Sequence, residues 1–525
     1  MSFISMEFLL FLLVSVVGYY LIPKKGQWIW LLIVSYLFYL SSGVKVLLFL
    51  VTTTVSTFVT GLLLEKEDVR LKQLIKSKKD KLTAEVKKMY KDKSKCRKRW
   101  LLAGALVLNF GILAVLKYCN FAIDNWNLLF DTNYEHVNFL LPLGISFYTF
   151  QSMGYLIDVY RKKYTPDHNL FRFALFVSYF PQLLQGPIGR FERLSHQFFV
   201  SHSFDLVRIE RGLQLMLWGY FKKMVLADRA AILVNQVFQQ YESYSGMTVI
   251  IAVLGYSLQL YADFSGGMDV VMGASECFGI SLDQNFRQPY FARSISDFWH
   301  RWHITLGTWM KDYIFYPLSL SKGMNRFGKF TKKYFGKHVG RVLPVCISNL
   351  VIFFVVGVWH GAAWKFIAYG LYNGLIIAFS NLVAPLYQKA GKALHIPQKA
   401  KPWMVFQILR TFVLVNIGWY FDMGISFTAA LIMMKQTVTG FSFLTLTDGS
   451  LLQLGLSMAD YAVLIMGSMV IFVVSLLKEH KISVRESLSK KPLIVRWGVY
   501  LLLMVSIPLL GQVTTGQGGF IYAQF

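Results

Sequence analysis

The fold is decided by the stretch VKVLLFLVTTTVSTFVTGLLL at residues 44–64, followed at once by EKEDVRLKQLIKSKKDKLTAEVKKMYKDKSKCRKR at residues 65–99. The first part is mostly apolar, with Lys45 as its one charged residue, and has the ~20 residues that a helix needs to cross a bilayer core. The second part holds 15 Lys or Arg against 6 Asp or Glu. Because Lys and Arg gather in cytoplasmic loops, this contrast predicts a membrane span followed by a basic, helical, cytoplasmic insertion.

The composition of the whole chain agrees with that interpretation. Of 525 residues, 55% are hydrophobic and only 16% are charged, whereas a soluble domain carries roughly 25% charged residues. A soluble enzyme and a disordered protein are therefore excluded, and we expect an all-α polytopic membrane protein. The net charge of +26 is explained by membrane topology, so nucleic-acid binding is not expected. The four cysteines are scattered without a CxxC pair, which predicts neither a disulfide framework nor a metal site.

Charge in the loops predicts the topology. Residues 123–136 contain no Lys or Arg and should lie outside, whereas 321–341 carry seven basic residues and no acidic one and should lie inside. The last span, 497–512, then delivers the tail 513–525 to the outside, and the N-terminus also starts outside. We expect about twelve crossings plus one or two re-entrant helices, forming one integral membrane domain over residues 1–525.

Three apolar runs bear on the number of crossings. The apolar runs 28–42 and 137–158 are both expected to be spans. Lys222 and Lys223 interrupt the run 212–228, and Arg229 falls on the expected outer side. Either these side chains extend to the interface or the stretch lies along it.

Ionisable residues inside apolar sequence are costly, and each marks a candidate functional site. The segment FWHRWHITLGTWMKDY at 298–313 places His300, Arg301, His303 and Asp312 among aromatic residues. At membrane depth such a segment must be buried in protein or line a wet cavity. An interfacial aromatic belt would explain the tryptophans but not the four ionisable residues together.

A second candidate is His360 in GVWHGAAW, residues 357–364. A lone histidine in apolar sequence is often only a core residue, but a neutral imidazole is also the natural general base for a hydroxyl. The chain has no HExxH, GxSxG or phosphate-binding glycine-rich motif. Direct attack by a base-activated hydroxyl is therefore the simplest chemistry, and no metal is predicted.

Both segments resemble motifs of the membrane-bound O-acyltransferase (MBOAT) family, in its bacterial alginate O-acetyltransferase-like branch. FWHRWHITL at 298–306 is similar to the family's FWxRWHISL, and WHGA at 359–362 is similar to its WHG motif. Further similar stretches occur in the family's order at residues 144–151, 180–182, 185–188 and 261–266. The resemblance covers nearly the whole chain.

The resemblance implies helices around a central tunnel through the membrane. A thioester donor, acetyl-CoA or a carrier protein, would enter that tunnel from the cytoplasm. His360 matches the family's invariant histidine and is expected to be the general base, and His303 a positioning or second acid/base group. The resemblance assigns no donor-binding residues.

The C-terminal sequence GGFIYAQF, residues 518–525, is similar to the FxYxxF signature of related acetylation and D-alanylation machineries. The resemblance implies that Tyr522 accepts the acyl group and passes it to an extracytoplasmic SGNH-type partner transferase. Ala523 departs from the family, which commonly has an aromatic residue there. The alternative for this tail is an aromatic anchor at the membrane interface.

Together these features predict a multi-pass O-acetyltransferase of the bacterial cell membrane. It would move acetyl toward a hydroxyl of an extracytoplasmic polysaccharide, such as peptidoglycan, an exopolysaccharide or a teichoic acid. The enzymatic alternative is D-alanyl transfer to teichoic acid. The non-enzymatic alternative is a transporter of polysaccharide or lipid-linked precursors, which would not explain the two histidine–tryptophan segments.

Overall fold

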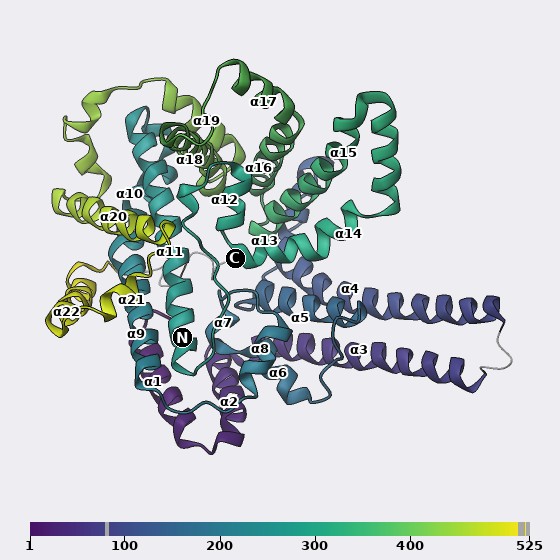
Figure 1. Ribbon diagram of the computed structural model, residues 1–525. Helices are drawn as coiled ribbons and strands as arrows, with labels where there is room; N and C mark the ends of the chain where they lie inside the picture. Colours follow the sequence, from purple (N-terminus) through teal and green to yellow (C-terminus); the bar gives the residue numbers. More distant parts are fainter. Residues whose placement is uncertain (79–82, 513–519, 521–525) are drawn as a thin grey trace. The chain divides into compact units, whose positions relative to one another are not determined.

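A computed structural model describes residues 1–78, 83–512 and 520, and every regular element in these ranges is helical (Figure 1). The described residues form two compact units, and α9 (Leu206–Tyr220) and α11 (Met247–Cys277) contribute residues to both. The first unit also contains η1 (Lys24–Gly26), α1 (Met6–Leu21), α2 (Gln27–Leu40), α3 (Val44–Ser77), α4 (Ala84–Phe130), α5 (Ile145–Tyr160), α6 (Leu170–Ser178), α7 (Phe180–Leu183) and α8 (Phe191–Phe198).

The second unit is built from more, and mostly later, helices. They are η3 (Phe221–Ala227), α10 (Asp228–Gln239), η4 (Tyr241–Ser243), η5 (Pro289–Phe291), α12 (Ile295–Arg301), α13 (Ile304–Met310), η6 (Lys311–Phe315), α14 (Tyr316–Ser319), α15 (Lys322–His360), α16 (Trp364–Leu382), α17 (Ala384–Ala393), α18 (Lys401–Met423), α19 (Phe427–Val438), η7 (Phe443–Leu446), η8 (Ser450–Leu454), α20 (Met458–Glu479), α21 (Val484–Ser489) and α22 (Leu493–Leu510). Two of these, η3 and η6, are π-helices.

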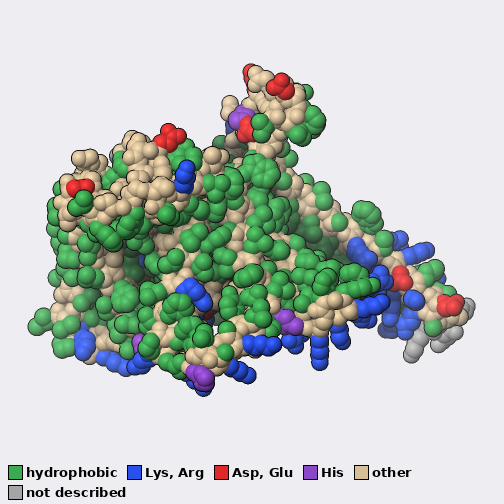
Figure 2. Space-filling view, turned by 90° about the horizontal axis from the view of Figure 1, so that it is seen from above, with side chains coloured by type: hydrophobic (Ala, Val, Ile, Leu, Met, Phe, Trp, Pro, Cys, Tyr) green, Lys and Arg blue, Asp and Glu red, His purple; other side chains and the backbone are tan. Residues whose placement is uncertain are grey.

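Seven helices among the described residues are long and apolar enough to cross a membrane: α3, α4, α11, α15, α18, α20 and α22. The pair α16 and α17 passes the same test together, with a bend of 58° between them. Hydrophobic side chains also cover most of the face seen in Figure 2. The expectation of an all-α polytopic membrane protein is therefore confirmed.

The described residues of the basic insertion at 65–99, which leave out 79–82, are mostly helical, as expected. It is formed by the end of α3 and the start of α4, which lie side by side as a long pair (Figure 1). Lys and Arg side chains gather toward the far end of this pair (Figure 2). Thr83 caps α4 by accepting a hydrogen bond from the Val86 amide, and Glu85 stands in the first turn. Both features favour helix initiation at this point.

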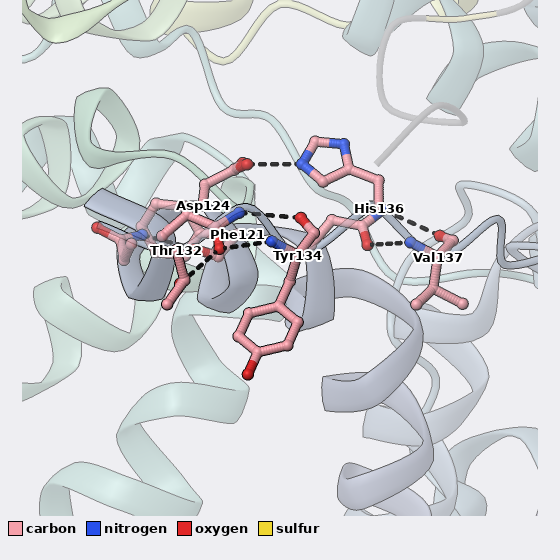
Figure 3. A network of polar contacts seen from close by, with 9 residues as sticks. Phe121, Asp124, Thr132, Tyr134, His136 and Val137 are labelled. Atoms are coloured by element: carbon pink, nitrogen blue, oxygen red, sulfur yellow. Dashed lines mark hydrogen bonds and ion pairs between the residues drawn. The ribbon is translucent and has the colours of Figure 1, made fainter. Parts of the chain in front are cut away.

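The segment without Lys or Arg, residues 123–136, contains the end of α4 and the loop that follows it. Figure 3 shows His136 facing Asp124, and the Nε2 to Oδ1 distance is 2.6 Å. Asn120 exchanges two hydrogen bonds with the backbone of Val137, of 3.0 and 2.9 Å. Asn127 does the same with the backbone of Tyr134, at 2.9 Å for each bond. Two asparagine amides thus tie the loop back onto the helix.

The expected number of about twelve crossings is higher than the seven or eight that the described helices provide. The difference comes from apolar runs whose helices are short. The run 28–42 becomes α2 with 14 residues, and 137–158 yields only the 16 residues of α5. At 1.5 Å per residue these helices fall short of the ~30 Å hydrocarbon core. Nearly all of α5 is buried, which explains why it is apolar without being a full span.

The basic segment 321–341 is helical rather than a loop. It opens α15, which folds back on itself at Gly336, where φ is +84° (Figure 1). A Cβ at Gly340 would lie 2.5 Å from the Cα of Lys332, so the two arms of the hairpin touch backbone to backbone. Glycine is needed at both points, at the first for its positive φ and at the second for the close approach.

Candidate active site

His360 is the last residue of α15, and the chain leaves helical geometry directly after it. Gly361 has an extended backbone, with φ 176°, so its φ alone does not demand glycine. A Cβ at Gly361 would, however, lie 2.3 Å from the ring of Phe366. The WHG sequence therefore lets the start of α16 pack directly against the end of α15, where the His360 side chain is buried with 3% exposure.

Glycines also bring the backbones of α15 and α16 into contact. A Cβ at Gly370 would lie 2.1 Å from the carbonyl oxygen of Phe353, and one at Gly357 would lie 2.5 Å from that of Phe366. Small residues at a helix interface allow this approach in membrane proteins. The two helices therefore fix the end of α15, and with it the position of His360.

Asp422, near the end of α18, faces His360. Its Oδ1 lies 3.7 Å from His360 Nδ1, and both side chains are buried. The other carboxylate oxygen, Oδ2, accepts a hydrogen bond of 2.7 Å from the hydroxyl of Tyr256 on α11. A carboxylate beside one imidazole nitrogen orients the ring and stabilises its protonated form. Nε2 is therefore the nitrogen that would act on a substrate.

His303 stands in the turn between α12 and α13, in a left-handed backbone conformation with φ 46° and ψ 53°. Asn285 holds this turn. Its backbone oxygen accepts from the amide of Ile304 at 3.0 Å. Its side-chain oxygen accepts from the amide and the hydroxyl of Thr305 at 2.9 and 2.7 Å. The unusual backbone at His303 is therefore supported by hydrogen bonds on the residues that follow it.

The two histidines share one buried aromatic site. The ring of Trp359 lies 5.5 Å from that of His303 and 5.3 Å from that of His360, measured between centroids. Phe264 on α11 packs edge-on against His303 at 4.8 Å, and Tyr369 on α16 lies 5.5 Å from His360. The structure thus brings together the two histidines that the sequence singled out, from segments more than 50 positions apart in the chain.

Burial lowers the pKa of His303 below its ordinary value, and the nearby His360 adds to the effect. His303 lies in a turn outside the candidate membrane-spanning helices. Its imidazole is therefore neutral near pH 7, with one nitrogen as donor and the other as acceptor. A neutral imidazole can position a polar substrate or share a proton with it.

The other ionisable residues of the 298–313 segment have different roles. His300 is exposed, and its Nδ1 lies 2.6 Å from the backbone oxygen of Ser296. Arg301 bridges Asp297 at 2.9 Å and Glu479 at 2.8 Å, which ties α12 to α20. Asp312 lies in the π-helix η6. We therefore assign the segment one site residue, His303, and a structural arginine.

Two further motif stretches belong to the first unit, where they form part of its core. Gln151 comes from the 144–151 stretch and Gln182 from the 180–182 stretch. Gln182 Nε2 donates to Gln151 Oε1 at 3.3 Å, and both residues are buried.

Lys222 and Lys223 are buried and paired with carboxylates, so their side chains do not extend into the solvent. Lys222 Nζ lies 2.7 Å from Asp269, and Lys223 Nζ lies 2.8 Å from Asp228 and 2.5 Å from Asp263. A buried ion needs a paired partner, and the 261–266 motif supplies one of these carboxylates. The same motif supplies Phe264, which contacts His303.

Tyr522, the expected acyl relay, lies outside the described residues. Over the part of the chain that the structure describes, no three His, Cys, Asp or Glu side chains form a group that could hold a metal ion. The buried His303 and His360 are suited to proton transfer.

Known proteins with similar sequences decide the family. The model of "MBOAT, membrane-bound O-acyltransferase family" matches residues 165–419. The chain is 34% identical to "Probable alginate O-acetylase AlgI" of Pseudomonas aeruginosa over 80% of this chain and 71% of that protein. This chain belongs to the membrane-bound O-acyltransferase family. It is also 31% identical to "Peptidoglycan O-acetyltransferase" of Helicobacter pylori, over 82% of this chain and 78% of that protein.

A more distant relative of this acyltransferase acts on another polymer. "Teichoic acid D-alanyltransferase" of Bacillus subtilis is 29% identical over 55% of this chain and 70% of that protein. The family resemblance expected from the sequence, and the expectation of an acyltransferase in a membrane, are confirmed. Because MBOAT proteins are acyltransferases, the transporter alternative is set aside.

Sequence reasoning missed two residues of the acyltransferase's candidate site, Asp422 and Tyr256. Asp422 lies one residue before the end of α18, where an apolar run ends. An acidic residue at the end of an apolar run was the available signal. Tyr256 offered none, because a tyrosine in an apolar helix is ordinary and its role depends on α18 packing beside α11.

Proposed function

We propose that this acyltransferase moves an acetyl group from acetyl-CoA on the cytoplasmic side, through a tunnel between its helices, to a hydroxyl on the other side of the membrane. The observation that carries the proposal is the buried His360, oriented by Asp422 and adjacent to His303 through Trp359. Such a site provides a general base that can activate a hydroxyl. It suits direct transfer from a thioester to an alcohol.

In the proposed reaction, His360 Nε2 removes the proton from the attacking hydroxyl. The oxygen forms a bond to the thioester carbonyl carbon, the C–S bond breaks, and the thiolate of coenzyme A leaves and takes up the proton from His360. Asp422, 3.7 Å from Nδ1, stabilises the imidazolium that exists between these two steps. His303 would position the carbonyl or the hydroxyl beside that base.

The proposed first acceptor is Tyr522 of the C-terminal signature, followed by an extracytoplasmic partner transferase of the SGNH type. This route keeps coenzyme A in the cytoplasm, where it is made, and moves only the acetyl group. It requires the C-terminus to lie outside in a bacterial cell membrane, as the distribution of Lys and Arg in the loops predicts.

The final acceptor that we propose is a polysaccharide. The relatives named for alginate and for peptidoglycan O-acetylation match about four fifths of the chain, which supports this substrate class. The relative named for teichoic acid D-alanylation matches just over half of it. D-alanyl transfer from a carrier-protein thioester is therefore the second candidate.

The test is to incubate the purified protein with radiolabelled acetyl-CoA and to measure label bound covalently to it. We expect label in the wild type and none in His360→Ala or Tyr522→Phe. His480→Ala is the matched control, because His480 is an exposed histidine on another helix end, and it should keep full labelling. Label that survives in Tyr522→Phe would keep the enzyme and exclude the relay. Label that survives in His360→Ala would refute the assigned base.

A protein that takes no label from acetyl-CoA would next be given a D-alanyl carrier protein. Labelling by that donor, dependent on His360, would establish the second candidate instead. Failure with both donors would refute the proposal of a thioester donor.

A further inference from the structure

The buried ions at Lys223 are not used in the reaction described above. Lys223 is 3% exposed, and its ammonium contacts two carboxylates, Asp228 on α10 and Asp263 on α11. One buried ammonium is thus held between two carboxylates. Such a group is costly in a membrane protein and marks a functional site by default.

A third group lies against this ammonium. The ring of Phe520 covers Lys223 Nζ at 5.2 Å from its centroid, and Phe520 is 2% exposed. A cation within about 6 Å of an aromatic face is attracted to it, more strongly when water is excluded. Phe520 is the first aromatic residue of the C-terminal signature. An aromatic side chain from the tail therefore packs against the Lys223 ammonium together with the two carboxylates.

The tail is attached to the same helix at an earlier point. The amide of Gln512 donates to the backbone oxygen of Met224 at 2.9 Å. Lys223 and Met224 are neighbours in η3, the π-helix at Phe221–Ala227. Single π-helical turns inside α-helices occur frequently at functional sites. Here the turn holds both the beginning of the tail and its first signature residue.

The same cluster adjoins the candidate active site through α11. Asp263 contacts Lys223 at 2.5 Å, and the next residue, Phe264, lies 4.8 Å from the ring of His303. The ion cluster and the candidate active site are therefore linked through consecutive residues of α11.

We propose that Lys223, held by Asp228 and Asp263, is a binding site for the Phe520 side chain and anchors the C-terminal signature at η3. The consequence for catalysis rests on the proposed function of Tyr522, whereas the anchoring itself does not. Phe520 would act as a positioning residue. Its ring fixes where the tail lies and takes no part in the chemistry.

The anchoring is tested on the full-length protein in detergent by carboxypeptidase digestion, followed by intact mass. The residues removed first, 521–525, are identical in every Phe520 variant, so their rate of release reports only how accessible the tail is. We expect release to be at least tenfold faster in Phe520→Ala and clearly faster in Phe520→Leu, which stays apolar but loses the ring. Phe520→Tyr keeps the ring and should match the wild type.

Equal rates in wild type and Phe520→Ala would overturn the anchor. A rate in Phe520→Leu equal to that of the wild type would overturn the role of Lys223, because leucine offers no face to a cation. These outcomes are independent of acetyl transfer. If the wild-type protein takes up no acetyl label, the relay through Tyr522 is refuted and the digestion result still stands. A tenfold loss of label on Tyr522 in Phe520→Ala would show that the anchor is needed for the relay.

Discussion

Replacing Asp422 by asparagine is the most direct test of how the site works. The substitution keeps the shape of the side chain and an oxygen that can accept the 2.7 Å hydrogen bond from Tyr256. It removes the negative charge that lies 3.7 Å from His360 Nδ1. The protonated imidazole formed during transfer would then lack its counter-ion in a buried site.

The size of the effect follows from that distance. Two unit charges 3.7 Å apart attract by about 4.5 kcal/mol at an effective dielectric constant of about 20. Since 1.36 kcal/mol is a factor of ten in rate, the upper limit is a loss of about two-thousandfold. The 3.7 Å separation is longer than a charge-assisted hydrogen bond of about 2.8 Å. We therefore expect kcat to fall by about a hundredfold to a thousandfold.

The assay is transfer of radiolabel at saturating and at limiting acetyl-CoA. A residue that acts through His360 should lower kcat and leave KM for the donor nearly unchanged. Asp422→Glu, which keeps the charge at a shifted position, should recover part of the rate. An Asp422→Asn enzyme within threefold of the wild type, with unchanged stability, would refute the role assigned to this carboxylate.

Three further outcomes are expected. Tyr256→Phe removes the hydroxyl that holds the carboxylate and should lower kcat about tenfold, measured by the same transfer assay. Gly370→Ala forces a Cβ to within 2.1 Å of the Phe353 carbonyl oxygen and should lower the free energy of unfolding by about 1–3 kcal/mol, seen as a reduced Tm in detergent. In Arg301→Lys, the lysine cannot bridge both Asp297 and Glu479. A double-mutant cycle with Glu479→Gln, measured as free energy of unfolding, should give a coupling energy of about 1 kcal/mol. Additive changes in stability would show that the 2.8 Å contact contributes nothing.

The sequence predicted the helical membrane fold because hydropathy and the distribution of Lys and Arg are local properties. It also identified both histidines, since His303 and His360 interrupt apolar sequence at motifs that can be recognised. The number of crossings was less predictable. An apolar run such as α5 is buried on nearly every side by other helices, and composition alone does not distinguish protein from lipid as the surroundings.

Asp422 could not be assigned from local sequence. Its approach to His360 depends on α15 and α16 meeting at Gly357 and Gly370 and on α18 packing beside them. These contacts join residues far apart in the chain. The pairing of Lys223 with Asp263 is of the same kind. Lys223 and Asp263 can each be recognised in the sequence as a charged residue in an apolar run. Only the fold shows that the two side chains form an ion pair.

The left-handed backbone at His303 sets the direction of its imidazole ring, so a change in this turn can affect activity without affecting the stability of the fold. Histidine visits this conformation more readily than most residues, but it still costs roughly 1 kcal/mol relative to the right-handed region. The direction of the imidazole thus depends on this turn, which Asn285 holds by three hydrogen bonds to Ile304 and Thr305. A change at Asn285 that lets this turn relax would swing the ring away from Trp359 while the helices stay packed. Inactive yet well-folded variants should therefore be sought at Asn285, and a screen for thermal stability alone would pass them.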